Sequence, residues 1–336
     1  MKILIADDDS VTLSLLEETL SKAGYEVVSV TNGQDAWHRL GHGDIRLVLT
    51  DWYMPRIDGI DLCKMIRSSK LPGYVYIIIL TSHDKKQNII TGLSAGADDF
   101  LSKPFDPEEL KLRLRIGERI LSAESRDVTI FTMVKMAESR DPETGLHLER
   151  MRKYSGVLAT HLGRTEKYRD IVTSDYCYNI YLASPLHDIG KLCIPDCVLL
   201  KPGSLSNDEW EIMKTHSQRG GETLDSALEE FPGIAYLEVA RDIAWSHHEK
   251  YDGSGYPRRL RGDEIPLSAQ IVALADVYDA VTSKRVYKEA FTPHVARSIV
   301  MDGKGKHFSP DIVDAFLATE QIFQNVQKEL SEKSDK

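Results

Sequence analysis

The chain has 336 residues, a length typical of about two domains, and its 42% hydrophobic and 28% charged residues exclude collagen-like and wholly disordered proteins. The 52 acidic residues outnumber the 42 basic ones, and the net charge of −10 disfavours a DNA partner, since duplex-DNA binders normally present a basic face. No apolar run approaches the ~18 residues of a membrane span, and the first residues lack the pattern of a signal peptide. Four cysteines in a chain of this length do not form a disulfide framework. We therefore expect a cytoplasmic protein with no membrane span and no DNA partner.

The first third of the chain alternates short apolar runs with helical patterns. Five strands are predicted at Lys2–Ala6, Tyr25–Val30, Leu47–Thr50, Tyr76–Leu80 and Asp99–Leu101. The helices expected with them are Val11–Ala23, with Ser10 as its N-cap, then Gln34–Leu40, Gly59–Ser68, Lys85–Ala95 and Pro107–Ile120. Strands that alternate with helices of this length predict an α/β fold with a doubly wound, five-stranded parallel sheet.

Helical patterns dominate from about Thr129 onward, and no strand rhythm continues there. We therefore predict a second, all-α domain, with the first domain at 1–122 and the second at 123–336. The last helix of the first domain could run on through Arg119–Arg126, which would make a semi-rigid helical connector at the start of the second.

Chemically informative side chains follow four of the predicted strands. They are Asp7, Asp8 and Asp9 after the first strand, Asp51 after the third, Thr81 after the fourth and Lys103 after the fifth. A single aspartate at a strand end is usually a helix cap or turn former, but the carboxyl ends of all these strands should meet at one edge. Clustered carboxylates favour a hard cation such as Mg²⁺, and a carboxylate can accept a phosphoryl group.

The stretch 1–122 resembles the receiver domain of two-component response regulators, which have a flavodoxin-like fold. The resemblance rests on the residues above, on Met54-Pro55 and Asp58-Gly59 after Asp51, and on Pro104 after Lys103. It implies that Asp51 is the phosphoacceptor, that Asp7 and Asp8 hold Mg²⁺, and that Thr81 and Lys103 contact the phosphoryl group. It also implies that Phe100 is the switch aromatic and that a cognate sensor histidine kinase is a partner. The role of Asp9 stays open.

Histidines and carboxylates recur with characteristic spacings in the second half. They are Glu143 and His147, the adjacent pairs His187-Asp188 and His247-His248, and the single residues His216 and Asp276. Nitrogen and oxygen donors without a thiolate suit Fe, Mn, Ni or Co better than a structural zinc ion. An adjacent His-Asp pair lets one carboxylate bridge two metals, which can clamp the oxygens of a phosphodiester. Lys191, one turn beyond His187, could reach a phosphate oxygen.

Residues from about 125 to 325 resemble the HD superfamily of metal-dependent phosphohydrolases. The match narrows to the HD-GYP branch at His248–Pro257 and continues through Ala275–Ala280 and Thr282–Arg285. The resemblance implies hydrolysis of cyclic di-GMP to linear pGpG, and in some members onward to GMP. By position, the implied metal ligands are Glu143, His147, His187, Asp188, His216, His247, His248 and Asp276. Asp188 and Lys191 take catalytic positions, and the implied substrate-binding residues are Lys191, Gly255, Tyr256, Pro257, Arg285 and Lys288.

The number of metal ions is a separate prediction. Together with water and a bridging carboxylate, six of these ligands can complete two octahedral ions, of which Fe and Mn are favoured, so Glu143 and His147 are treated as surplus and assigned to a third. Two other outputs stay open: a non-catalytic sensor of cyclic di-GMP or protein-docking domain, and a hydrolase of another cyclic dinucleotide. The sequence also leaves open the sign of regulation, the final product, and whether the chain forms a homodimer or binds other signalling proteins.

Overall fold

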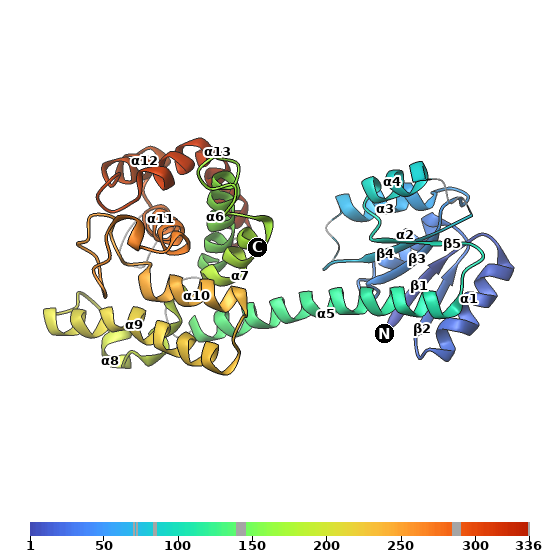
Figure 1. The fold of residues 1–336 in the computed structure, drawn as a ribbon, viewed down its shortest axis with the longest axis horizontal. Helices are drawn as coiled ribbons and strands as arrows, with labels where there is room; N and C mark the ends of the chain where they lie inside the picture. The colour runs from blue at the N-terminus through green and yellow to red at the C-terminus, as the bar shows by residue number, and fades with distance from the viewer. Residues whose placement is uncertain (70, 72, 83–85, 139–145, 284–289, 335–336) are drawn as a thin grey trace. The chain divides into compact units, whose positions relative to one another are not determined.

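The computed structural model describes all residues except 70, 72, 83–85, 139–145, 284–289 and 335–336. The chain divides into two compact units, Met1–Val128 and Thr129–Lys336 (Figure 1). No helix in the described ranges is both long enough and apolar enough to cross a membrane.

The first unit is a parallel sheet with helices on both faces. Its strands are β1 (Lys2–Ala6), β2 (Glu26–Val30), β3 (Leu47–Asp51), β4 (Tyr76–Thr81) and β5 (Asp99–Ser102), in the spatial order β2-β1-β3-β4-β5. Its helices are α1 (Ser10–Lys22), α2 (Gly33–Leu40), α3 (Gly59–Ser68), α4 (Lys86–Ala95) and α5 (Pro107–Glu138). The predicted α/β fold with five parallel strands is confirmed. The ladders pair Asp51 with Leu80 and Thr81 with Ser102, so three strands run one residue further than expected.

Alternate residues of each strand are buried against different helices. Ile3 and Ile5 of β1 pack in one cluster with Leu16 of α1 and Leu110 of α5. The residue between them, Leu4, packs in the other cluster with α2 and α3 side chains. Because both faces of the sheet are covered, the strands are largely apolar, and their polar residues lie at the strand ends or next to them.

The N-cap predicted for the first helix is wrong by one residue. The Asp9 carboxylate accepts hydrogen bonds from the backbone N–H of Val11 (3.3 Å) and of Thr12 (3.1 Å), so Asp9 caps α1 and Ser10 is its first residue. Both residue types are good caps, but a carboxylate also interacts favourably with the positive end of the helix. This contact gives Asp9 the structural role that the sequence left open.

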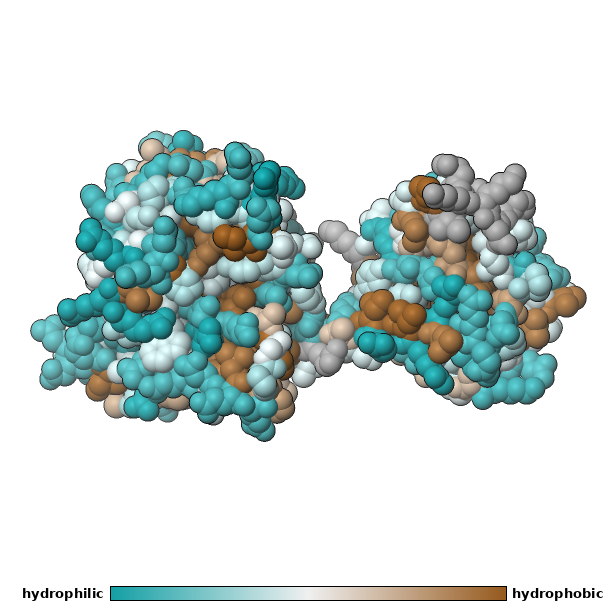
Figure 2. Space-filling view, viewed as in Figure 1, coloured by the Kyte–Doolittle hydropathy of each residue, from teal (hydrophilic) through white to brown (hydrophobic). Residues whose placement is uncertain are grey.

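Helix α5 is much longer than the pattern predicted, and its continuation through Arg119–Arg126 is confirmed. Gly117 lets it lie close to the sheet, because a Cβ there would come within 2.6 Å of the Tyr76 ring. Leu121 lies in a core of the first unit, and Val134 lies in the core of the second. On the outer side, exposed Leu112, Ile116 and Ile120 recur every four residues, and Figure 2 shows hydrophobic side chains gathered over this part of α5.

The second unit is helical, as predicted. Its elements are α6 (His147–Leu162), α7 (Ser174–Ala183), the 3₁₀ segment η1 (Ser184–Cys193), α8 (Asp196–Leu199), α9 (Asn207–Glu230), α10 (Ala235–Ser246), the 3₁₀ turn η2 (Gly262–Glu264), α11 (Leu267–Thr282), α12 (Pro293–Asp302) and α13 (Pro310–Ser334). Tyr154 of α6 stacks on Phe323 of α13, with ring centroids 4.4 Å apart, and meets Tyr278 of α11 edge-on. These aromatic contacts join α6, α11 and α13 at the centre of the unit's core.

Gly59, the first residue of α3, offers a test of the first unit's packing. A Cβ at Gly59 would lie 2.1 Å from the backbone oxygen of Asp51, so Gly59→Ala forces α3 away from the end of β3. We expect a loss of about 1–3 kcal/mol in the free energy of unfolding of this unit, the usual cost of overpacking.

The matched control is Gly156→Ala in α6, where the nearest atom to the new Cβ is 3.8 Å away. The same change there should be neutral or stabilising, since alanine favours helix interiors by up to ~1 kcal/mol over glycine. Thermal unfolding of both variants measures the contrast. Equal midpoints in the two variants would show that α3 has room to shift.

Candidate functional site

Three carboxylates and one ammonium group meet at the carboxyl edge of the sheet. Lys103 Nζ lies 2.6 Å from Asp7 Oδ2 and 2.8 Å from Asp51 Oδ1. Asp7, Asp8 and Asp51 each offer an oxygen within 4.8 Å of the others, and only Asp8 is exposed. This arrangement can hold a hard divalent cation beside Asp51.

The charges at this edge depend on one another. Burial raises the pKa of the Asp51 carboxyl, although the hydrogen bond from Lys103 opposes the shift. Burial would lower the pKa of Lys103, but its hydrogen bonds to Asp51 and Asp7 raise it. Lys103 therefore stays charged and compensates part of the negative charge of the carboxylates.

Thr81 and Phe100 are the residues to which the receiver resemblance assigns contact with the phosphoryl group and the switch aromatic, respectively. Thr81 is buried at the end of β4. The Phe100 ring on β5 lies 6.3 Å from the Trp52 ring and close against Gly92, where a Cβ would come within 2.2 Å of it. Five of the predicted receiver residues thus lie at the strand ends, and the Phe100 ring contacts Trp52, the residue after Asp51.

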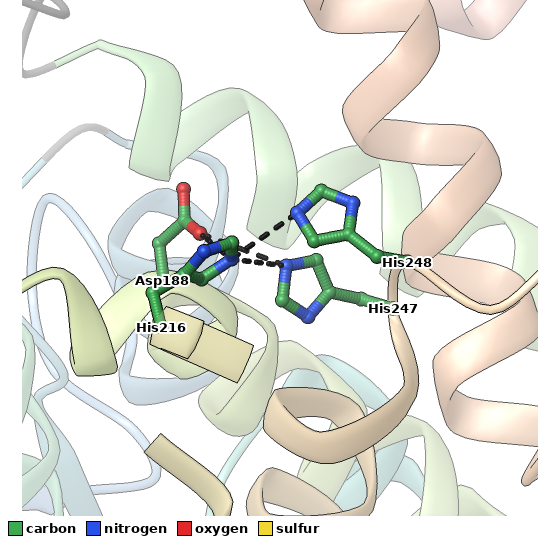
Figure 3. Close-up of side chains that lie close together, drawn as sticks. All are labelled: Asp188, His216, His247 and His248. Atoms are coloured by element: carbon green, nitrogen blue, oxygen red, sulfur yellow. Dashed lines mark hydrogen bonds and ion pairs between the residues drawn. The ribbon is translucent and has the colours of Figure 1, made fainter. Parts of the chain in front are cut away.

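In the second unit, four side chains converge on one point (Figure 3). They are Asp188 of η1, His216 of α9, His247 at the end of α10 and the adjacent His248, and each offers a donor atom within 4.8 Å of the others. His216 Nε2 lies 3.1 Å from Asp188 Oδ1, 3.4 Å from His247 Nε2 and 3.1 Å from His248 Nε2.

A second group lies on the other side of Asp188. It consists of His147 at the start of α6, His187 of η1 and Asp276 of α11. Asp188 Oδ2 lies 3.3 Å from His187 Nε2, whereas Oδ1 faces the first group. The Asp188 carboxylate therefore has one oxygen toward each group, the arrangement that a bridging ligand needs.

Hydrogen bonds behind the rings decide which nitrogen faces the site. The Nδ1–H groups of His187, His216 and His247 donate to the backbone oxygens of Ser184 (2.9 Å), Met213 (2.7 Å) and Ile243 (3.0 Å), respectively. A carbonyl only accepts, so Nδ1 carries a proton, and in the neutral imidazole Nε2 then keeps its lone pair. Such backing partners are typical of metal-ligating histidines.

This tautomer pattern makes the site fit a metal ion. His216 Nε2 and His247 Nε2 face each other at 3.4 Å with lone pairs, next to the anionic Asp188, which is unfavourable without a cation between them. His147 Nε2 is buried and has no hydrogen-bond partner among the described residues. The nitrogen and oxygen donors of both groups, with no thiolate, suit divalent transition metals.

The protonation states agree with this fit. Burial would raise the pKa of the Asp188 carboxyl, but Lys191 and His187 hold it well below its usual range. Burial and the neighbouring His247 and His216 hold the pKa of His248 well below its usual range. Metal ligands must be anionic carboxylates or neutral imidazoles, and these groups are.

The Tyr256 ring lies over the edge of the first group. Its centroid is 4.8 Å from that of His248, at an angle of 29°. A Cβ at Gly255 would lie 2.3 Å from the backbone nitrogen of Lys250, so only glycine fits this close approach. Buried Glu249 accepts hydrogen bonds from the N–H groups of Arg258 (2.7 Å) and Leu260 (3.1 Å) and thereby holds the loop that contains Pro257.

Two supporting residues were missed by the sequence analysis. Glu249 follows the His247-His248 pair directly, and its position there is a signal that could have been used. Asp279 is buried and lies 2.7 Å from His147 Nδ1, and it follows Asp276 by three residues on α11. Burial would lower the pKa of His147, but the hydrogen bond to Asp279 raises it.

The predicted ligand set is largely brought together. Seven of its members form the two groups, and Lys191 Nζ lies 2.8 Å from Asp188 Oδ2. His147, treated as surplus to a two-ion site, instead lies in the group with His187 and Asp276, because α6 packs against α11 and η1. Glu143, Arg285 and Lys288 lie outside the described residues. Helix α6 begins at His147, so no described helix contains both Glu143 and His147, the pair assigned to a third ion.

Comparison with known proteins places both units. Residues 3–115 match the response regulator receiver domain, and residues 132–312 match the HD domain. The chain is 37% identical to the "Probable cyclic di-GMP phosphodiesterase" of Vibrio cholerae serotype O1, over 98% of this chain and 80% of that protein. It is 36% identical to the "Cyclic di-GMP phosphodiesterase response regulator RpfG" of Xanthomonas campestris pv. campestris, over 94% and 87%. It is 34% identical to the "Cyclic di-GMP phosphodiesterase" of Thermotoga maritima, over 98% and 93%.

The fold, the two candidate sites and the comparisons indicate the same class of protein. A receiver fold with an acidic strand edge, joined to a helical unit with clustered histidines and aspartates, defines a response regulator with an HD-domain output. The chain belongs to the family of two-domain response regulators that pair a receiver domain with an HD domain, as the resemblances in its sequence predicted.

Proposed function

We propose that this response regulator hydrolyses cyclic di-GMP in its second unit and that phosphorylation of Asp51 in its receiver controls the reaction. The observation that carries the proposal is the Asp188 carboxylate, which has one oxygen toward each of two groups of metal-type donors. The names of the three relatives support the same substrate. The expected product is linear pGpG, and the reaction would take place in the cytoplasm.

In the proposed reaction, some residues of the second unit hold the metal ions and others contact the substrate. The two groups would hold two divalent ions, Fe or Mn, with Asp188 as the shared ligand. Such ions supply an activated water nucleophile and neutralise charge on the phosphodiester. Lys191, whose ammonium group lies 2.8 Å from Asp188 Oδ2, would contact a phosphate oxygen of the substrate beside that ligand. The Tyr256 loop would cover the dinucleotide, and Arg285 and Lys288 would contact its phosphates.

In the receiver, an Asp51 carboxylate oxygen would attack the phosphorus of a phosphohistidine on a cognate sensor kinase. The new bond is O–P, the P–N bond breaks, and its electron pair stays on the imidazole of the kinase. Lys103, 2.8 Å from Asp51 Oδ1, would compensate charge on the transferred group. Asp7 and Asp8 would hold Mg²⁺ beside it, and Thr81 and Phe100 would respond to the phosphoryl group.

A second candidate substrate, 3'3'-cGAMP, is supported by another relative. The chain is 42% identical to the "3'3'-cGAMP-specific phosphodiesterase 2" of Vibrio cholerae, over 56% of this chain and 34% of that protein. Hydrolysis of this related dinucleotide would use the same ions and the same Lys191. The assay below therefore includes both nucleotides.

Asp188→Ala tests the hydrolytic proposal. Loss of the shared ligand should lower turnover of cyclic di-GMP by more than ~100-fold, above the ~10–100-fold usual for outer-sphere partners of a metal. The measurement is product formation by chromatography with protein loaded with Fe or Mn without oxygen. Asp175→Ala, which removes an exposed acid from the first turn of α7, is the control and should keep full activity.

Two results would contradict this assignment. Wild-type protein that binds cyclic di-GMP but never cleaves it would support a sensor or docking output. A higher kcat/KM for 3'3'-cGAMP than for cyclic di-GMP would reassign the substrate.

Asp51→Asn tests the phosphoacceptor and its control of the output. A small phosphodonor such as acetyl phosphate should label wild type with acid-labile phosphate and leave Asp51→Asn unlabelled. The donor should also change cyclic di-GMP turnover in wild type and not in the variant. Asp61→Asn, an exposed acid on α3, is the matched control and should behave as wild type. Undiminished labelling of Asp51→Asn would refute Asp51 as the phosphoacceptor. Unchanged turnover of cyclic di-GMP by wild type after addition of the donor would refute regulation by phosphorylation.

We also propose a third ion to which Glu143 contributes; His147, which the sequence assigned to the same ion, instead offers its Nε2 to the group with His187 and Asp276. A further cation would favour binding of a substrate with two phosphates and stabilise charge in the transition state. Elemental analysis should give about three ions per wild-type chain and about two in Glu143→Ala, because removal of a ligand lowers metal affinity. Glu149→Ala, in the first turn of α6, is the control. Saturation of wild type at about two ions would end this proposal.

A further inference from the structure

His147 is supported differently from the other histidines of the site. His187, His216 and His247 donate Nδ1–H to a carbonyl of the preceding turn of the chain. His147 is the first residue of α6, so this helix has no earlier turn that could accept its proton. The partner is a carboxylate from another helix: Asp279 Oδ2 of α11 lies 2.7 Å from His147 Nδ1.

We propose that Asp279, held in place by Arg150, is a positioning residue for the metal ion of the group formed by His147, His187 and Asp276. It fixes the tautomer of His147 so that Nε2 faces the site, and its charge makes the imidazole a stronger donor than a carbonyl would. The inference rests on the proposed function in one respect, that this group holds a metal ion.

The burial of Asp279 requires a compensating charge, and Arg150 supplies it. Asp279 is 1% exposed and Arg150 is 6% exposed. The guanidinium contacts the carboxylate twice: Nε bonds Oδ1, and Nη2 lies 3.0 Å from Oδ2. An isolated buried carboxylate would be costly, but a two-point contact with arginine offsets that cost and fixes the plane of the carboxylate.

The same two helices therefore supply both the ligands and their support. On α6, His147 and Arg150 are three residues apart, and on α11, Asp276 and Asp279 are three residues apart, so each pair shares one face of its helix. His147 and Asp276 offer donor atoms to the ion, while Arg150 and Asp279 pair behind them. Packing of α6 on α11 thus sets the direction of the His147 lone pair.

Asp279→Asn is the sharpest variant, because it keeps the volume and an acceptor oxygen and removes only the charge. The full chain is stripped of metal without oxygen and titrated with Mn(II), and free Mn(II) is measured by its electron paramagnetic resonance signal. The binding class lost in His147→Ala identifies the group in question. Asp279→Asn should weaken that class by ~10–100-fold and leave the other class unchanged.

Two further variants make the measurement decisive. In a His147→Ala background, Asp279→Asn should have no additional effect on Mn(II) binding, whereas a general structural role would give additive effects. Arg150→Lys keeps a charge beside Asp279 but loses the two-point contact, so it should weaken the same class by a smaller factor. The control is Asp225→Asn, which removes the carboxylate that accepts from Trp245 Nε1 (2.9 Å) and should bind Mn(II) as wild type does.

Unchanged Mn(II) affinity in folded Asp279→Asn or Arg150→Lys would overturn the proposal. Equal weakening of both binding classes would do so as well, and so would additive effects when Asp279→Asn is combined with His147→Ala. These results are independent of hydrolysis. A wild type that binds Mn(II) in two classes but never cleaves cyclic di-GMP would end the proposed function and leave the role of Asp279 standing.

Discussion

The second unit is organised around a conflict of lone pairs that only a cation resolves. His216 and His247 are locked by backbone carbonyls into the tautomer whose Nε2 faces inward, and the anionic Asp188 lies beside them. In the neutral imidazoles neither Nε2 carries a proton, so the same hydrogen bonds that fix the rings leave two lone pairs facing each other, an arrangement that a metal ion between them would stabilise. Rings held in this tautomer are already in the form that a metal ligand must have, a neutral imidazole with Nε2 toward the site.

The receiver faces a related problem and resolves it with a side chain of its own. Three carboxylates meet at the sheet edge, and Lys103 reaches two of them, Asp7 and Asp51. The ammonium group of Lys103 compensates part of the negative charge of these carboxylates without a metal ion. Asp8 and the remaining oxygen of Asp51 stay available to a hard cation. The chain has a net charge of −10. Both sites bring carboxylates or imidazole lone pairs together at a point where a cation would be stabilised. Their donors differ, oxygen alone in the receiver and nitrogen with oxygen in the HD unit, and this difference favours Mg²⁺ at one and transition metals at the other.

Features formed by residues close together in the sequence could be predicted, whereas those formed by residues far apart could not, unless the sheet itself brings them together. The strands and the residues at their ends were predictable because a parallel sheet brings all its carboxyl ends to one edge, whatever the details of packing. His187-Asp188 and His247-His248 were predictable as adjacent pairs. The association of His147 with His187 and Asp276 was not, because it depends on how α6 packs against α11 and η1. Asp279 and Glu249 were missed for a similar reason: their function is to accept hydrogen bonds from residues brought close by folding, and their own spacing carries no ligand pattern. The N-cap at Ser10 failed because two good capping residues are adjacent, and geometry selected Asp9.

Helix α5 limits the ways in which the receiver can influence the output. Up to residue 124 the helix is fastened to the sheet: Gly117 permits close approach to Tyr76, and Glu124 accepts from the backbone N–H of Tyr74 (3.0 Å) and pairs with Arg46. Ten residues further on, Val134 is buried in the core of the second unit. Helix α5 therefore has buried residues in both cores and is the covalent connection between the receiver and the output. Coupling by this route requires two discrete packings of α5 in at least one of the cores, since a helix packed in a single way at both ends transmits nothing. The contacts of Glu124 with Arg46 and Tyr74 are polar and lie near the surface, which makes them easier to exchange than the apolar contacts of Leu110 and Leu114.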